Sequence, residues 1–163
     1  MINFHQLYES YAADVYRFAY WLAGDSAEAE DITAETFVRA WVKHSSIRTE
    51  TLKAYLFTIA RNLYLEDQRN MPQQISLGDF YPDPSPNPEQ VVEVKFEIRR
   101  IQNFLQTLPE IDRTAFILRV QHELPYAEIA RALEISLSAA KVKVHRVRKK
   151  LITNSISQEE VPA

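Results

Sequence analysis

The sequence predicts an all-α protein made of two small helical lobes joined by a proline-rich tether. Apolar residues recur with the spacing of a helix rather than of a strand almost throughout the chain. Glycine occurs only twice, at Gly24 and Gly78, and five of the eight prolines fall between residues 71 and 88. With 163 residues, 46% of them hydrophobic, the chain can bury one ordinary core or two small ones.

Three helical patterns fill the N-terminal part of the chain. The first is a single apolar stripe, with Asn3 placed to cap it and Gly24 placed to end it. The second starts at once, since Asp25 is a favourable cap, and it runs to about His44. The third follows the stretch SSIRTET and repeats leucine, isoleucine and tyrosine at helical spacing. We expect one lobe of three to four helices over residues 1–70.

A proline-rich tether follows over residues 71–88. It contains the stretch YPDPSPNP, and proline at that density excludes helix interiors and sheets, because proline has no backbone N–H to donate. The Asn-Pro-Glu at its end is typical of a helix start. A second lobe is therefore expected over residues 89–155, with a short tail over residues 156–163. Within this lobe, Pro109 and Pro125 each open a further helix.

The stretch PYAEIARALEISLSAAKVKVHRVRKKL has the spacing of a helix-turn-helix. Two apolar stripes flank Glu134, Ile135 and Ser136, where Ile135 can fill the space between the helices and Ser136 can cap the second. That second helix carries six cations and no acid between Leu137 and Leu151, so it can follow phosphates. A helical hairpin with a solvated basic face is the alternative. The candidate DNA-contacting residues are small at the helix start and basic along its flanks: Ser138, Ala139, Lys141, Val142, Lys143, His145 and Arg146.

The second predicted helix has two usable faces. One apolar face can serve its own lobe, whereas Asp31, Glu35, Val38 and Val42 form a stripe on another face. A second stripe of this kind indicates a surface that binds a partner. From periodicity alone, an ordinary exposed helix fits equally well.

The third predicted helix combines aromatic rings and cations opposite its leucine stripe. Bases of a single strand stack on rings while cations hold the backbone, so this face suits an opened nucleic acid. Its candidate residues are Lys53, Phe57, Arg61, Asn62, Tyr64 and Arg69. The alternative is that Phe57 and Tyr64 pack inside the protein, as single aromatic residues more often do.

Three motifs, separated by the tether, resemble a known family. AEAEDITAETFVRAW and LKAYLFTIARNLYLEDQR are similar to the core-polymerase-binding and minus-ten-reading regions of extracytoplasmic-function (ECF) sigma factors, group IV of the sigma-70 family. LQTLPEIDRTAFILRVQHELPYAEIARALEISLSAAKVKVHRVRKKL resembles the minus-thirty-five-reading region of the same family. The chain departs from the family pattern at Glu134, where glycine is usual in the turn, and at Val142, where serine is frequent.

The resemblance implies a sigma factor that recruits core RNA polymerase to specific promoters and supports promoter melting. The stripe on the second helix would contact the coiled coil of the largest polymerase subunit. The helix-turn-helix would read upstream duplex DNA, and the third helix would capture the opened downstream strand. The polar loop at residues 43–52 would hold a flipped promoter base, and the acidic tether would run through the RNA-exit region. An anti-sigma factor is a further expected partner.

Other functional classes have less support. The four histidines do not have the spacing of a metal-ligand pair on one helix, and neither a glycine-rich phosphate loop nor a nucleophile elbow occurs. We therefore expect that the protein is not an enzyme and that it has no cofactor and no metal site. A free-standing helix-turn-helix repressor with an N-terminal regulatory lobe is the alternative, and it predicts a dimer at palindromic sites. The sequence has no bilayer-length apolar run, no basic-then-apolar leader and no cysteine, which together predict a cytoplasmic protein.

Overall fold

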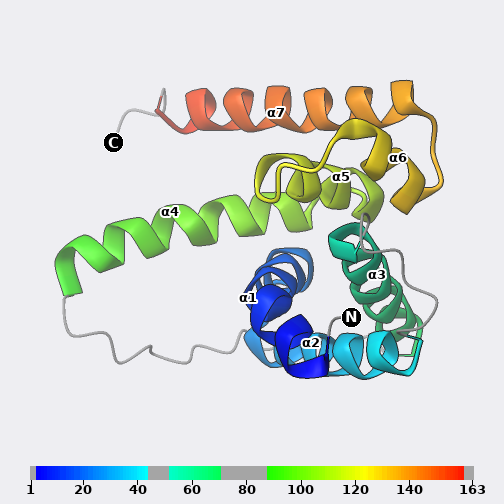
Figure 1. Cartoon of the computed structure of the whole chain (residues 1–163). Helices are drawn as coiled ribbons and strands as arrows, with labels where there is room; N and C mark the ends of the chain where they lie inside the picture. Colours follow the sequence, from blue (N-terminus) through cyan, green and yellow to red (C-terminus); the bar gives the residue numbers. More distant parts are fainter. Residues whose placement is uncertain (1–2, 44–51, 71–87, 160–163) are drawn as a thin grey trace.

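The computed structural model describes residues 3–43, 52–70 and 88–159, and over these ranges the chain is helical with no strand (Figure 1). This agrees with the all-α class that the periodicity predicts. The predicted tether lies outside the described residues, apart from its last residue, Pro88. The helices are α1 (Phe4–Ala23), α2 (Ser26–Val42), α3 (Leu52–Asn70), α4 (Pro88–Gln106), α5 (Glu110–Val120), α6 (Tyr126–Leu133) and α7 (Leu137–Glu159).

The predicted boundaries of α1 are confirmed by its caps. The Asn3 side chain accepts a hydrogen bond from the backbone N–H of Gln6 at 2.8 Å, and the Gln6 side chain accepts one from the backbone N–H of Asn3 at 3.4 Å. Gly24 ends the helix with φ of 75°, a conformation that glycine adopts without steric cost. Asp25 then caps α2 through the N–H of Ala27 at 3.0 Å, and α2 ends at Val42, slightly before the predicted end at His44.

Helices α1, α2 and α3 pack on one another and form the N-terminal lobe, at the bottom of Figure 1. Their apolar stripes meet around fully buried side chains, among them Phe18, Leu22, Ile32, Phe37 and Leu56. Burial of such side chains is the main stabilising contribution to a small helical lobe. No described helix has an apolar stretch of the length that crossing a bilayer requires.

The helix-turn-helix geometry is confirmed between α6 and α7. Glu134 follows α6 with φ of 56° and ψ of 45°, in the left-handed region, and the N–H of Ile135 donates to the carbonyl oxygen of Ala130 at 3.0 Å. Ser136 caps α7, since its Oγ accepts from the N–H of Ala139 at 3.0 Å. Ile135 packs partly buried against the core, as expected for a residue between two helices.

The two lobes share one hydrophobic core. The buried cluster that contains Phe18 and Phe57 continues into the C-terminal lobe through Leu118, Ile129 and Val144. Helix α5 contacts α1, and α6 contacts α3, so α5 and α6 lie between α7 and the N-terminal lobe (Figure 1). The two helical lobes that the sequence predicts are therefore packed against each other in this structure.

Helix α4 adds a second, smaller contact between the lobes. Its N-terminal half projects away from the body (Figure 1). Near its C-terminal end, Leu105 clusters with Leu108 and with Val147 of α7, and Trp21 of α1 packs against this cluster. The Gln106 amide also donates to the carbonyl oxygen of Leu22 at 3.0 Å. Helix α7 continues to Glu159, beyond the boundary at residue 155 that the sequence predicted for this lobe.

Candidate functional site

The outward face of α7 is open. The core stripe of this helix is buried at Ala140, Val144 and Val147, and α7 contacts only α5 and α6 strongly among the described helices. Most of the predicted DNA-contacting residues lie on the other side of the helix. Ser138, Lys141, Val142, His145 and Arg146 are exposed, and Ala139 is half-buried.

Lys143 is the exception in the predicted set, because it turns inward. Its Nζ donates to Oδ1 of Asp112 at 3.0 Å, and the Asp112 side chain is only 7% exposed. A buried carboxylate requires a partner of this kind to offset its lost hydration. The prediction that Lys143 lies free on the DNA-facing side is wrong in this structure, where the residue ties α7 to α5.

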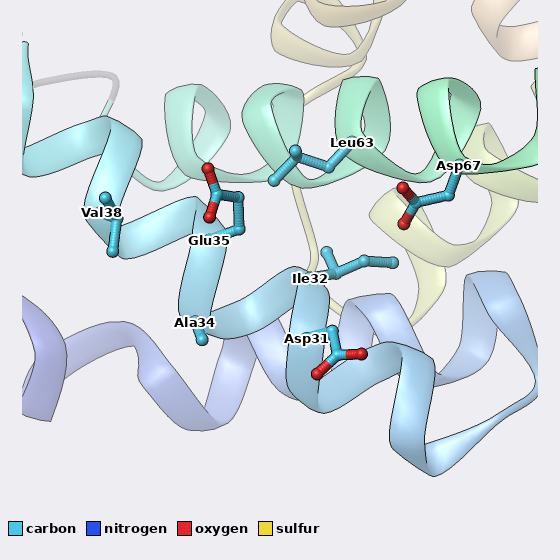
Figure 2. Close-up of a pocket in the computed structure, with 7 residues that line it drawn as sticks. All are labelled: Asp31, Ile32, Ala34, Glu35, Val38, Leu63 and Asp67. Atoms are coloured by element: carbon cyan, nitrogen blue, oxygen red, sulfur yellow. The ribbon is translucent and has the colours of Figure 1, made fainter. Parts of the chain in front are cut away.

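The outward face of α2 is exposed as the sequence predicts. Val38 is 54% and Val42 75% exposed, and Asp31 and Glu35 are exposed beside them. An open groove of about 450 Å³ runs between α2 and α3 along this face. Its walls are drawn in Figure 2 and comprise Asp31, Ile32, Ala34, Glu35, Val38, Leu63 and Asp67.

Ile32 and Ala34 of α2 were not predicted as groove residues, and neither were Leu63 and Asp67. Leu63 and Asp67 come from α3, and Figure 2 shows Glu35 and Asp67 pointing into the space between the two helices. The pKa of nearby Glu28 is raised by burial and then by the charges of Asp25, Asp67 and Asp31. The gathered negative charge suits a cationic partner.

The predicted aromatic face of α3 is covered by the C-terminal lobe. Phe57 is 1% exposed, and its ring centroid lies 4.9 Å from that of Phe18 and 4.5 Å from that of His122. Tyr64 is 6% exposed, and its hydroxyl accepts a hydrogen bond from Nη2 of Arg113 at 3.0 Å. The prediction that these two rings are exposed is wrong, and the alternative, that they pack inside the protein, is confirmed, because α5 and the turn after it pack on this face.

Arg61 is held by a two-point ion pair across the lobes. Its Nε and Nη2 donate to the two carboxylate oxygens of Glu110 at 2.7 and 2.9 Å, and Thr114 Oγ1 donates to the same carboxylate at 2.7 Å. Burial alone would raise the pKa of Glu110, but these hydrogen bonds and the charges of Arg61 and Arg113 outweigh it and lower that pKa. The cation predicted to contact DNA therefore binds a carboxylate here.

The other residues predicted on α3 lie at the margins of this contact. Asn62 and Arg69 are exposed, and Lys53 is half-buried with its Nζ 5.9 Å from the centroid of the Phe57 ring. The predicted base-holding loop, residues 43–52, lies mostly outside the described residues.

His122 is buried at the centre of the lobe contact. It is 6% exposed, and burial, with the charges of Lys53 and Arg17, lowers its pKa to about 4, although Asp14 acts in the opposite direction. Its Nε2 has no hydrogen-bond partner among the described residues. His122, like Glu110 and Arg113, was not predicted to hold the lobes together, because each partner residue lies far away in the sequence.

Comparison with known proteins decides the family. Residues 7–70 match the model of sigma-70 region 2, and residues 98–151 match that of sigma-70 region 4. The ECF RNA polymerase sigma factor SigM from Bacillus subtilis is 30% identical over 90% of this chain and 91% of its own length. This chain belongs to the ECF family of RNA polymerase sigma factors. SigE from Mycolicibacterium smegmatis is 32% identical over 93% of this chain, which spans 61% of that longer relative.

A solved structure supports the fold of this ECF sigma factor. The sigma factor RpoE from Bartonella quintana, solved in complex with the anti-sigma factor NepR, covers 91% of this chain with a TM-score of 0.72 at 23% identity, and 93% of RpoE is aligned. The family consists of transcription initiation factors. Over the ranges that the structure describes, no group of three acidic or histidine side chains could hold a metal ion.

Proposed function

We propose that this sigma factor recruits core RNA polymerase through α2 and reads promoter DNA through α7 and α3. The observation that carries the proposal is the open pair of outward faces on α2 and α7, on two different lobes, in a chain that belongs to a family of promoter-recognition factors. The division of labour follows the predicted domains: residues 1–70 for docking and the minus-ten element, residues 71–88 as linker, and residues 89–155 for the minus-thirty-five element.

The docking face proposed on α2 centres on Asp31, Glu35, Val38 and Val42. The groove beside it has an apolar floor and acidic sides, so it suits a partner helix that presents apolar and basic side chains. Asp67 of α3 extends the acidic side and joins the proposed contact.

The upstream duplex is proposed to lie along the outward face of α7. Small side chains at its start let the helix approach base edges, and cations along its flanks reach phosphates. The proposed contacts are Ser138, Ala139, Lys141, Val142, His145 and Arg146. Lys143 joins them only if its ion pair with Asp112 opens.

The downstream strand requires a rearrangement before α3 can bind it. Phe57, Arg61 and Tyr64 are covered by α5 and the turn after it, so their proposed stacking and backbone contacts require the lobes to separate. Lys53, Asn62 and Arg69 would complete the surface. We propose that docking on core polymerase supplies the free energy of separation, because both lobes then gain partners of their own.

The remaining assignments follow from this role. The chain is proposed to act where the polymerase is, in the bacterial cytoplasm, and to leave the bond-forming chemistry to the polymerase. An anti-sigma factor is proposed as a further partner, by analogy with the NepR complex of the Bartonella protein. The named relatives are all sigma factors, so no observation favours the free-standing repressor.

The test is transcription with purified components. Full-length protein is mixed with core polymerase, and co-elution and runoff transcription are measured on promoters selected from a randomised upstream and downstream library. We expect co-elution and transcripts that depend on both elements. Failure to bind core polymerase, or a dimer that binds palindromic duplex without polymerase, would refute the proposal.

A further inference from the structure

Val142 is an apolar side chain in the middle of the open face of α7. It is 50% exposed and contributes nothing to the core, which α7 contacts through Ala140, Val144 and Val147. Four-residue spacing places Val142 in one stripe with Ser138 and Arg146. A β-branched residue is a poorer choice than alanine at an exposed helix position, so local helix stability does not explain it.

The chemistry of the major groove identifies what such a side chain can contact. Every base edge there presents polar donors or acceptors, and the largest apolar group that unmodified DNA exposes in this groove is the C5-methyl of thymine. An exposed apolar side chain that faces the groove therefore gains most by contact with that methyl group.

We propose that Val142 selects thymine at one position of the upstream promoter element by contact with its C5-methyl group. The inference rests on the proposed placement of α7 in upstream duplex. It adds a specific reader to the stripe of Ser138, Val142 and Arg146, whose other members are small or cationic. The other exposed apolar residue near the start of α7, Leu137 at 46%, lies about 140° around the helix from Val142. Within the described residues, Lys141 and Arg146 have no ion-pair partner, so both are available for phosphates or guanine.

The helix geometry restricts where the thymine lies. Val142 and Arg146 are four residues apart, about 6 Å along the helix axis, and successive base pairs are about 3.4 Å apart. The selected thymine therefore lies within about two base pairs of the base or phosphate that Arg146 contacts. Ala139, one turn earlier on the same side, is half-buried and shorter, so it presents less apolar surface to the groove.

The experiment replaces single thymines of the upstream element by deoxyuridine, which removes only the methyl group. Full-length protein with core polymerase first selects its element from a promoter library randomised upstream, and initial transcription rates are then measured at limiting holoenzyme. We expect one position to lose about 4-fold, the value for one methyl group in apolar contact. The initial rate of Val142→Ala on the thymine promoter should be lower by a similar factor. Deoxyuridine at that position should cause no further loss of rate in this variant.

A matched control is Ile152→Ala, because Ile152 is an exposed apolar residue further along the same helix, at 62%. This variant should keep the full response to deoxyuridine. The inference is overturned if no deoxyuridine lowers the rate, if Val142→Ala responds as the unaltered protein does, or if the selected element contains no A·T pair. If one of these outcomes occurs but Arg146→Ala still loses its preference among bases, the proposed role of α7 in reading DNA is retained and only the assignment of Val142 to thymine is refuted. If the holoenzyme selects no upstream element, both fall.

Discussion

Replacing Glu110 with glutamine is expected to loosen the contact between the two lobes. The Glu110 carboxylate binds Arg61 through two hydrogen bonds at 2.7 and 2.9 Å, and the side chains of Arg61 and Glu110 are only 16% and 21% exposed. Glutamine keeps the shape of the side chain but removes its charge and one acceptor oxygen. The guanidinium of Arg61 is then left partly buried without its counter-ion.

The magnitude follows from this partial burial. A hydrogen bond to a charged group contributes about 1.5–3 kcal/mol, and removing one partner of a fully buried ion pair costs about 3–5 kcal/mol. Because part of each side chain remains in water, the lower range applies, and we expect a cost of about 2 kcal/mol. That cost corresponds to about a 30-fold shift from packed toward separated lobes.

Tryptophan fluorescence can measure this shift directly. The chain has two tryptophans: Trp21 packs against the α4 cluster at the lobe contact, and Trp41 is 36% exposed on α2. In a Trp41→Phe background, Trp21 emission reports the lobe contact while far-ultraviolet circular dichroism reports helix content. In urea titrations, Glu110→Gln should lower the free energy of the Trp21 transition by about 2 kcal/mol.

Glu97→Gln is the matched control. Glu97 pairs with Arg100 at 3.3 Å on the surface of α4, with 57% of its side chain exposed, so its loss should cost below about 0.5 kcal/mol. In the double variant, the losses of free energy caused by Glu110→Gln and Arg61→Gln should also be less than additive, because both substitutions break the same contact. A Trp21 transition that shifts no more for Glu110→Gln than for Glu97→Gln would show that this ion pair does not hold the lobes.

Three further predictions concern the docking face, the buried histidine and the turn. Asp31→Lys combined with Glu35→Lys should abolish co-elution with core polymerase while the circular dichroism spectrum stays unchanged. Binding of the double variant as tight as that of the unaltered protein would show that α2 is not the docking face. The pKa of His122 is about 4 in the folded chain and ordinarily 6.5, so the unfolded chain takes up the proton first. The contribution of His122 to the free energy of unfolding should therefore be level above about pH 6.5 and fall toward pH 4. In urea titrations at fixed pH, His122→Leu should remove this contribution, whereas the loss below about pH 4.5 that follows from the lowered pKa of Glu110 should remain. Glu134→Gly should stabilise the protein by about 0.5–1 kcal/mol in thermal unfolding, because residue 134 has a left-handed backbone conformation that glycine adopts without steric cost. An equal gain in Glu134→Ala would show that loss of the Glu134 charge, rather than the backbone conformation, is the cause.

Local signals predicted the helices and the turn well. Asn3 and Gly24 bound α1 as expected, and Ser136 caps α7, because caps depend on neighbouring backbone groups that the sequence itself places nearby. The exposed stripe on α2 was also predictable, since four side chains at helical spacing faced away from an apolar stripe that was sufficient for the core.

Contacts between distant segments were not predictable in the same way. Phe57 and Tyr64 lie opposite a leucine stripe and therefore suggested an exposed face, but α5 and the turn after it cover them. Periodicity shows that a helix has two faces and cannot show what covers the second one. Lys143 was misplaced for a related reason, because its partner Asp112 lies on another helix and its pairing leaves no local pattern.

With the two lobes packed together, which we call the closed chain, the outward face of α7 is open and the aromatic face of α3 is covered. Duplex DNA and single-stranded nucleic acid therefore have different access to the closed chain. Cations of α7 remain available to duplex, whereas the rings of Phe57 and Tyr64 are inaccessible to any unpaired strand. If α7 and α3 act as proposed, a closed chain can sample duplex without being sequestered by single-stranded DNA or by transcripts. Strand capture then becomes conditional on opening, so non-productive binding to the abundant RNA of a growing cell is suppressed by the packing of α5 against the N-terminal lobe.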